Sequence, residues 1–176
     1  MTDDVVDSTL NKGTKVLVTV YLEQRLVEEN FADEQISIEE LLKEGNFKGR
    51  RALVAEDNDF NREIAIELLK MMDITADGAE NGAEAVEMVE NSEEGYYDII
   101  FLDIQMPVMD GCEAAGRIRS MNRADAATVP LIAVSANAFA QDVQESYNAG
   151  INEHLAKPID IRKLYRVMTH YLNDNA

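Results

Sequence analysis

The chain has little of several features that mark other classes of protein. Its 176 residues include a single cysteine, Cys112, which excludes an internal disulfide framework and a zinc site built on several thiolates. No stretch approaches the roughly 20 consecutive apolar residues that a membrane-spanning helix needs, and the acidic start lacks the basic and apolar regions of a secretion signal. We therefore expect a cytoplasmic chain without direct membrane contact, which leaves open that a longer parent protein is anchored in a membrane.

Basic residues are also scarce. The sequence has 16 Lys and Arg residues against 34 Asp and Glu residues, which gives a formal net charge of -18 at pH 7. A balance as acidic as this repels the phosphate backbone, so we expect no binding of nucleic acid. Hydrophobic residues make up 46% of the chain, enough for one packed domain with a short appendage.

Residues 49–176 carry a repeating pattern of short apolar runs and amphipathic stretches. Apolar runs bounded by turn residues are typical of buried parallel strands, and the stretches between them have the apolar spacing of helices. The predicted strands are residues 51–55, 74–79, 98–102, 129–134 and 151–155, each followed by a predicted helix. This alternation predicts an α/β fold with one doubly wound, five-stranded parallel sheet and helices on both faces.

Three of the predicted helices carry further local signals. In the first, Ile64, Leu68 and Met71 have the spacing of a buried stripe. Gly150 follows another helix in the position of a C-terminal cap. Asp160 is expected to cap the N-terminus of the last helix.

Residues 1–48 form a separate N-terminal extension or linker in this interpretation. Between Lys15 and Leu22 apolar and polar residues alternate, which predicts a half-buried antiparallel strand. No obvious partner strand lies nearby in the sequence. We therefore expect this strand to pair with a neighbour or to be poorly ordered, because an unpaired strand exposes backbone hydrogen-bonding groups.

Polar side chains stand at the ends of four predicted strands. Glu56 and Asp57 follow the first strand, and the third, fourth and fifth are followed by Asp103, Ser135 and Lys157. Because the carboxyl ends of parallel strands meet at one edge of a sheet, we expect these side chains to lie together. Three carboxylates, one hydroxyl and one ammonium suit a divalent metal and a phosphoryl group.

Asp103 is the expected nucleophile of this group. It ends the central strand and precedes a loop that contains Pro107 and Gly111. A carboxylate in that position can take up a phosphoryl group as an acyl phosphate. For Asp103 alone, the alternative is a residue that caps the loop.

The neighbouring residues indicate a magnesium site. Adjacent carboxylates raise one another's pKa unless a cation neutralises them, and Mg²⁺ takes oxygen ligands from carboxylates, waters and phosphates. We expect Asp57 to bind the ion directly and Glu56 through water. Lys157, held extended by the proline that follows it, and the Ser135 hydroxyl would bind phosphoryl oxygens. The alternative is a solvated acidic turn with ordinary surface residues nearby.

These motifs closely resemble those of the receiver domain of two-component response regulators, the CheY-like family. The resemblance covers residues 49–172 and rests on the acidic pair at 56–57, Asn81-Gly-Ala-Glu-Ala, Asp-x-x-Met-Pro-x-Met-Asp-Gly at 103–111, Ser135-Ala136 and Lys157-Pro158. It implies a flavodoxin-like fold with Asp103 as the phosphoacceptor. It also implies that Asp57, Asp103 and the backbone carbonyl of Gln105 bind Mg²⁺, with Glu56 acting through water.

The resemblance further implies how such a site works. The receiver itself catalyses transfer from a phosphohistidine and then slowly hydrolyses its own acyl phosphate, at a rate tuned at positions 105 and 137. Ser135 and Lys157 would couple the phosphoryl group to the surface around the last strand. Receivers usually have Tyr or Phe three positions before this lysine, and here that position is His154. Ser135 and His154 are therefore expected to form a switch, and the alternative is that His154 has no signalling role.

The sequences of these motifs are similar to those of receivers fused to hybrid sensor histidine kinases. Residues 7–22 resemble the last hairpin of a kinase ATPase domain, against the alternative of an unrelated arm. The fragment contains neither a phosphoacceptor-histidine motif nor an ATP-binding glycine loop, so we expect it to catalyse only its own phosphotransfer and dephosphorylation. The expected partners are the phosphohistidine domain of a kinase and a histidine phosphotransfer protein, and a homodimer stays open.

Three other functions compete with an active receiver. A haloacid-dehalogenase-type phosphatase needs a general-acid aspartate two residues after the nucleophile, where this chain has Gln105. A flavodoxin-like nucleotide binder would suffer repulsion between its phosphate and the acidic pair at 56–57. A phosphorylation-independent pseudo-receiver that serves only as a protein-binding module is the serious alternative. We expect no attached DNA-binding output after Ala176, and a readout by onward phosphotransfer or by feedback on the kinase.

Overall fold

The N-terminal unit contains a short antiparallel hairpin. The computed structural model describes residues 5–9, 13–17, 47–136 and 140–173, and the chain divides into two compact units, Met1–Gln35 and Ile36–Ala176. In the first unit β1 (Val5–Thr9) pairs with β2 (Gly13–Leu17), with Asp7 opposite Lys15. The prediction that this strand lacks a nearby partner is wrong, because β1 has only two adjacent apolar residues and shows no alternation. Residues 18–22 of the predicted strand lie outside the described residues.

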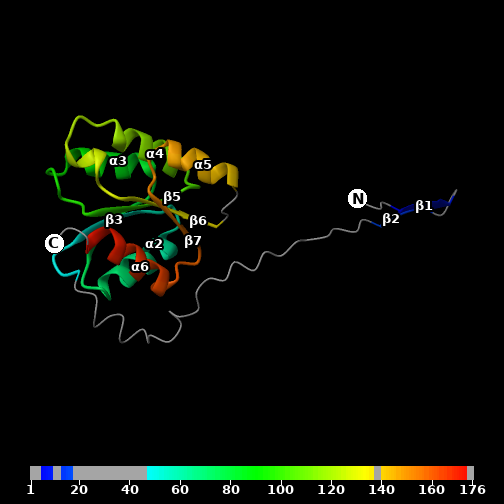
Figure 1. Cartoon of the computed structure of the whole chain (residues 1–176), viewed down its shortest axis with the longest axis horizontal. Coiled ribbons are helices and arrows are strands. Elements are labelled where there is room, and N and C mark those ends of the chain that lie inside the picture. Colours follow the sequence, from blue (N-terminus) through cyan, green and yellow to red (C-terminus); the bar gives the residue numbers. More distant parts are fainter. Residues whose placement is uncertain (1–4, 10–12, 18–46, 137–139, 174–176) are drawn as a thin grey trace. The chain divides into compact units, whose positions relative to one another are not determined.

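The second unit is built on a five-stranded parallel sheet, as predicted (Figure 1). Its strand order is β4-β3-β5-β6-β7, which is the doubly wound order of flavodoxin-like folds. The strands are β3 (Arg51–Ala55), β4 (Thr75–Ala79), β5 (Ile99–Asp103), β6 (Leu131–Ser135) and β7 (Glu153–Ala156). This order places β3 directly beside β5, so the residues that follow these two strands are neighbours.

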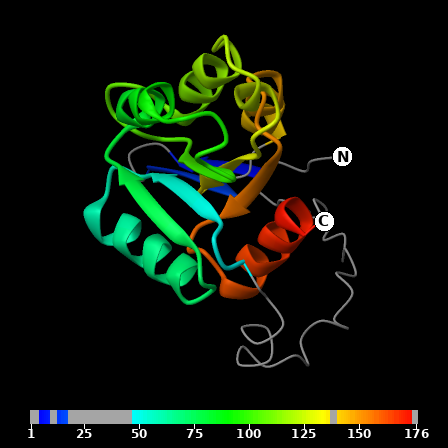
Figure 2. The same cartoon turned by 90° about the vertical axis from the view of Figure 1, so that its left-hand side faces the viewer.

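Five helices cover the two faces of the sheet. They are α2 (Asp59–Lys70), α3 (Gly82–Asn91), α4 (Gly111–Arg119), α5 (Ala140–Asn148) and α6 (Ile161–Leu172). Helices α3, α4 and α5 lie on one face, and α2 and α6 on the other (Figures 1 and 2). Along β3, Leu53 packs toward the first group and Val54 toward the second. Both faces of a doubly wound sheet are buried, which explains why its strands read as continuous apolar runs.

Several helix ends match their sequence signals. Asp160 caps α6 by accepting hydrogen bonds from the backbone N–H groups of the first turn, and Asn58 caps α2 in the same way. Gly150 follows α5 with φ +94°, a left-handed conformation that favours glycine. Within the described part of the chain, no helix combines the length and apolar character that crossing a bilayer requires.

The predicted buried stripe of the first helix is wrong at two of its three residues. Leu68 packs against the core, whereas Ile64 is 42% exposed and Met71, which follows the helix, is 54% exposed. The fully buried residues of α2 are Ala65 and Leu69, which lie one position further along the chain than Ile64 and Leu68. An apolar strip is therefore exposed on α2.

The loop after β5 depends on Gly111. A Cβ atom at this position would lie 2.3 Å from the carbonyl oxygen of Asp103, whereas one at Gly116 would meet nothing within 4 Å. Both glycines belong to α4 and have ordinary backbone angles for any residue. The two positions therefore differ only in the room that is available for a Cβ atom.

We expect Gly111→Ala to destabilise the domain by more than ~2 kcal/mol, because the backbone of Asp103 has to move. The matched change Gly116→Ala should stabilise it by about 0.5–1 kcal/mol through helix propensity. Urea denaturation of both variants measures the two values. Equal effects at the two positions would contradict the close approach at Gly111.

Candidate functional site

The carboxyl ends of four strands bring the predicted polar residues together. Glu56 and Asp57 follow β3, Asp103 ends β5, Ser135 ends β6 and Lys157 directly follows β7. Carboxylate oxygens from Glu56, Asp57 and Asp103 lie within 4.8 Å of one another. The sheet therefore gathers at one edge three acidic groups that are far apart in the sequence.

Lys157 connects two of these acidic groups. Its Nζ lies 2.5 Å from Glu56 Oε2 and donates a hydrogen bond of 2.7 Å to Asp103 Oδ2. The backbone N–H of Lys157 donates to the carbonyl of Ser135 at 2.9 Å, and the Lys157–Pro158 peptide is cis. One ammonium is thus shared by two carboxylates that come from β3 and β5.

Burial and hydrogen bonds together shift the pKa values of Asp103 and Lys157. Glu56 and Asp103 are each only 5% exposed. Burial raises the pKa of the Asp103 carboxyl, hydrogen bonds from Lys157 and from the Gln105 N–H offset part of that rise, and the charge of Glu56 adds to it. Burial disfavours the charged ammonium as well, but hydrogen bonds to both carboxylates outweigh this and hold the pKa of Lys157 above its ordinary value. Lys157 therefore stays charged at neutral pH.

The remaining oxygens differ in their surroundings. The second oxygen of Asp103, Oδ1, accepts the backbone N–H of Gln105 at 3.1 Å, which fixes the plane of the carboxylate. Asp57 is exposed to solvent. The site therefore combines two buried, hydrogen-bonded carboxylates with one that is exposed, and all its acidic donors are oxygen atoms. Oxygen donors of this kind suit a hard divalent cation, so the cluster could bind a metal.

Two residues of the site were missed in the sequence. Asn61 Nδ2 donates to Glu56 Oε1 at 3.1 Å, and Arg62 Nη1 donates to the backbone carbonyl of Glu56 at 2.7 Å. Both lie in the first turn of α2, one turn past the acidic pair. Polar residues at a helix start normally indicate capping, so the pattern did not reveal that they hold Glu56.

His154 lies on β7 and contacts α5. Its Nε2 is 2.6 Å from Ser146 Oγ, and its ring packs edge-on against Tyr147 with centroids 5.1 Å apart. Its Nδ1 is buried without a hydrogen-bond partner, and burial lowers the pKa of the ring. His154 is therefore neutral at pH 7. Asn137, implied by the resemblance, lies outside the described residues.

Known proteins share this sequence pattern. A family model described as "Response regulator receiver domain" matches residues 52–169. Over 116 residues the chain is 37% identical to "Hybrid signal transduction histidine kinase A" of Dictyostelium discoideum, a match that covers 65% of this chain and 5% of that kinase. The chain spans between 5% and 17% of the length of five such relatives.

Solved structures share the fold. The receiver domain of sensor histidine kinase PA1611 from Pseudomonas aeruginosa, which has a magnesium ion coordinated in its active-site cleft, is 31% identical with a TM-score of 0.64 over 71% of this chain and 98% of that one. The Saccharomyces cerevisiae histidine phosphotransfer protein Ypd1 has been co-crystallised with the receiver domain of its downstream response regulator Ssk1. The likeness to a chain of that complex has 30% identity and a TM-score of 0.60 over 69% of this chain and 88% of that one.

The raised pKa of Asp103 predicts a stability penalty. An acid whose pKa is higher in the folded state than in the unfolded state destabilises the fold at every pH above that raised value. At pH 7.5 and without metal, Asp103→Asn should therefore raise the melting temperature by roughly 3 °C. In a domain of this size, a rise of ~1 kcal/mol in the free energy of unfolding gives such a shift. Thermal unfolding in the presence of chelator measures this. Glu87→Gln, an exposed charge removal on α3, is the control for general charge repulsion, and an equal rise in both variants would contradict the burial effect.

Proposed function

This chain belongs to the response regulator receiver family, and we propose that within a two-component phosphorelay it accepts a phosphoryl group from a phosphohistidine onto Asp103. The observation that carries this proposal is the buried Asp103 carboxylate, bonded to the Lys157 ammonium and flanked by the carboxylates of Glu56 and Asp57. A salt bridge that only stabilised the fold would not need two further carboxylates within 4.8 Å of the Asp103 carboxylate.

The proposed reaction is a displacement at phosphorus. An oxygen of Asp103 forms a bond to the phosphorus atom, the bond between phosphorus and the imidazole nitrogen breaks, and the imidazole leaves with the electron pair. The product is an acyl phosphate on Asp103. The Lys157 ammonium would exchange its hydrogen bond to Asp103 for one to a phosphoryl oxygen. The Ser135 hydroxyl is proposed to donate to another phosphoryl oxygen. Water later cleaves the acyl phosphate and restores the carboxylate.

Mg²⁺ is the metal that we propose for this site. Asp57, Asp103 and the backbone carbonyl of Gln105 would hold it, with Glu56 acting through water. When bound, the ion supplies positive charge that neutralises phosphoryl oxygens as the new bond forms. The oxygen-only donor set supports this choice, as does the magnesium ion in the related receiver structure.

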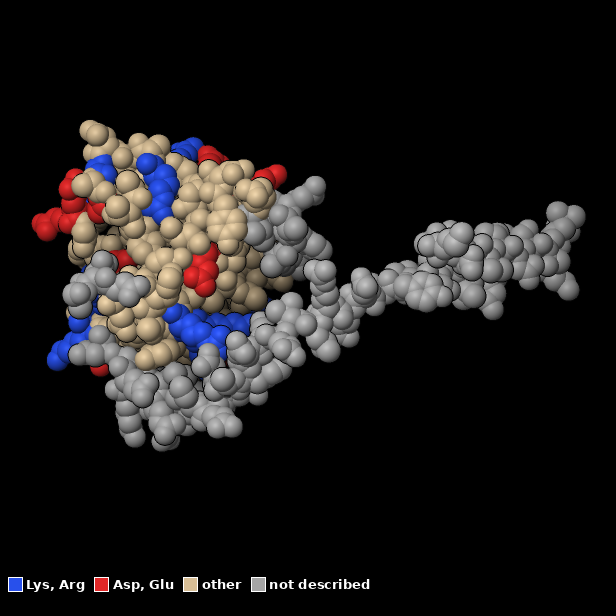
Figure 3. All heavy atoms as spheres, viewed as in Figure 1, with Lys and Arg blue, Asp and Glu red and all other residues tan. Residues whose placement is uncertain are grey.

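We propose that Ser135 and His154 transmit the phosphorylation state to the surface formed by α5, β7 and α6. Ser135 ends β6 beside the site, while the hydrogen bond between His154 and Ser146 connects β7 to α5. Much of the face drawn in Figure 3 is uncharged, with acidic and basic groups interspersed.

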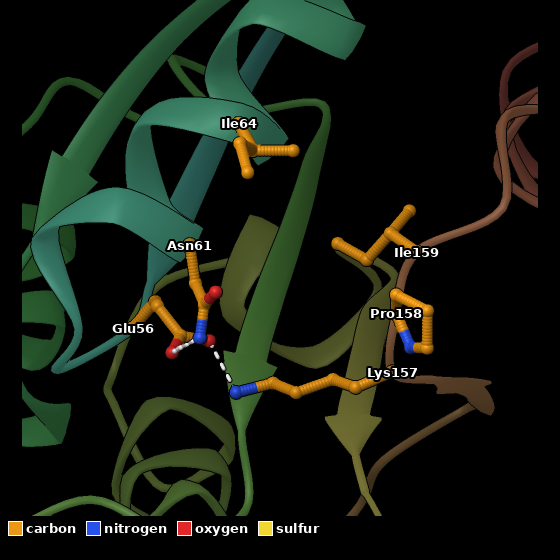
Figure 4. Close-up of a pocket in the computed structure, with 6 residues that line it drawn as sticks. All are labelled: Glu56, Asn61, Ile64, Lys157, Pro158 and Ile159. Atoms are coloured by element: carbon orange, nitrogen blue, oxygen red, sulfur yellow. Dashed lines mark hydrogen bonds and ion pairs between the residues drawn. The ribbon is translucent and has the colours of Figure 1, made fainter.

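The partner is proposed to dock beside the site, over the start of α2. Phe60 is 69% exposed and Ile64 is 42% exposed on this helix. A cavity of about 350 Å³ lies between the helix and the segment after β7; Glu56, Asn61 and Ile64 line one side, and Lys157, Pro158 and Ile159 the other (Figure 4). A histidine that reaches Asp103 has to be presented by a surface that covers this rim, so the exposed apolar side chains would be buried in the encounter.

We also propose that residues 49–176 are the receiver part of a hybrid histidine kinase and that residues 1–48 connect it to a preceding domain. The kinase relatives support this, because the chain spans only a small part of their length. The hairpin β1–β2 supports the proposal that residues 1–22 belong to the end of a kinase ATPase domain.

Incubation with acetyl phosphate and Mg²⁺, followed by intact mass measurement, tests the proposed chemistry. We expect one phosphoryl adduct on the native chain and none on Asp103→Asn or in excess chelator. No adduct on the native chain would overturn the receiver chemistry and favour a phosphorylation-independent binding module. An adduct that survives in Asp103→Asn would place the acceptor elsewhere.

Removal of the apolar rim should slow transfer from a protein donor but not from a small molecule. We expect Phe60→Ala combined with Ile64→Ala to reduce the rate of transfer from a phosphorylated histidine phosphotransfer protein by about tenfold or more. The rate with acetyl phosphate should stay within about twofold, because no partner surface is involved. Met71→Ala removes an exposed apolar side chain beyond the far end of α2 and is the matched control. An equal loss with both donors would contradict a docking role.

A further inference from the structure

The first turn of α2 departs from the usual arrangement of a capped helix. Asn58 accepts the backbone N–H of Asn61 at 3.0 Å, which is the first half of a capping box. In a complete capping box the side chain of the third helical residue reaches back to the backbone N–H of the cap. Here that residue is Asn61, and its amide reaches further, to the carboxylate of Glu56. The Asn61 side chain thus holds an acidic residue of the site and does not complete the cap of its own helix.

Glu56 is held at both its side chain and its backbone. Its two carboxylate oxygens each have one donor, Asn61 Nδ2 at 3.1 Å on Oε1 and Lys157 Nζ at 2.5 Å on Oε2 (Figure 4). Its backbone carbonyl accepts from Arg62, whose side chain is 15% exposed and lies against β4 next to Gly78. Because Glu56 is 5% exposed, water has little access to replace either donor.

The choice of a neutral donor has an electrostatic consequence. A lysine or arginine in place of Asn61 would orient Glu56 equally well but would cancel its charge. A carboxamide fixes the carboxylate and leaves the negative charge of the cluster available to a divalent cation. Such supporting hydrogen bonds determine the orientation of groups around metals and typically affect metal affinity by about 10- to 100-fold.

We propose that Asn61 is a positioning residue of the metal site, which orients the Glu56 carboxylate toward Asp57 and Asp103 without reducing its charge. The inference rests on the proposed function, because it takes the three-carboxylate cluster as the place where Mg²⁺ binds. Asn61 acts only through Glu56. The double variant of the two residues therefore tests it more sharply than the loss of either one.

The experiment is a Mg²⁺ titration of the full chain, followed by calorimetry or by amide chemical shifts, for the native protein, Asn61→Ala, Glu56→Ala and the double variant. We expect Asn61→Ala to weaken Mg²⁺ binding by about tenfold in the native background and by less than about twofold in the Glu56→Ala background. Asn91→Ala, the same change on an exposed site of α3, should leave the affinity unchanged. Alanine favours helices and the Asn58 cap remains, but a buried oxygen of Glu56 loses its donor, so Asn61→Ala should melt about 3 °C or more below native without metal while still unfolding in one cooperative transition.

Three results would overturn the proposal, and they are distinguishable. Unchanged Mg²⁺ affinity in Asn61→Ala would show that Asn61 does not support the site, while the proposed function stands. An equal weakening in both backgrounds would show that Asn61 acts by a route other than Glu56. Absence of Mg²⁺ binding by the native chain would remove the proposed function together with this inference.

Discussion

The shared ammonium of Lys157 is the interaction on which the rest of the site depends. Two carboxylates at 5% exposure cannot stay buried without a cation, because desolvation of an unpaired charge costs several kcal/mol. Lys157 provides that cation, although it comes from β7 while Asp103 and Glu56 come from β5 and β3. The lysine side chain has to reach across β6 to meet both. The strand order, in which β3, β5, β6 and β7 are consecutive neighbours, brings these three residues to one edge at that spacing.

One cation for two buried carboxylates leaves the site short of positive charge. Asp57 adds a third carboxylate nearby, and the pKa of Asp103 is raised because burial outweighs its bond to Lys157. In the proposed function, the same imbalance would favour a divalent cation and keep an oxygen of Asp103 available as the phosphoryl acceptor. The backbone of Asp103, at the end of β5, is closely packed, because Gly111 leaves no room for a Cβ atom beside it. The buried charges thus lie at one edge of the sheet, while its two faces are packed by apolar side chains.

The sequence predicted the fold and the principal site residues because both follow from the same rule. Continuous apolar runs identify parallel strands, and the polar residue that ends each run must lie at the carboxyl edge of the sheet. Position along one strand was therefore enough to place Glu56, Asp103 and Lys157. The roles assigned to these residues remain predictions, as does the boundary at residue 48.

The sequence did not show which of two equally apolar helix faces is buried against the sheet. The spacing of Ile64 and Met71 is as helical as that of Ala65 and Leu69, and packing alone decides which pair meets the sheet. Asn61 and the partner of His154, Ser146, were missed for a related reason, since side-chain hydrogen bonds across elements leave no periodic signal. The partner of β2 was missed because the two apolar residues of β1 are adjacent and show no alternation.

The most direct measurement of the proposed site is an amide NMR spectrum of the native chain with Mg²⁺ and beryllofluoride, which stands in for a phosphoryl group on a carboxylate. A stoichiometric adduct should form only with Mg²⁺ present. The largest shifts should lie after β3, β5, β6 and β7, and Asp103→Asn should give none of them. No adduct on the native chain, or an unchanged one on Asp103→Asn, would contradict a phosphoacceptor at Asp103 balanced by Lys157.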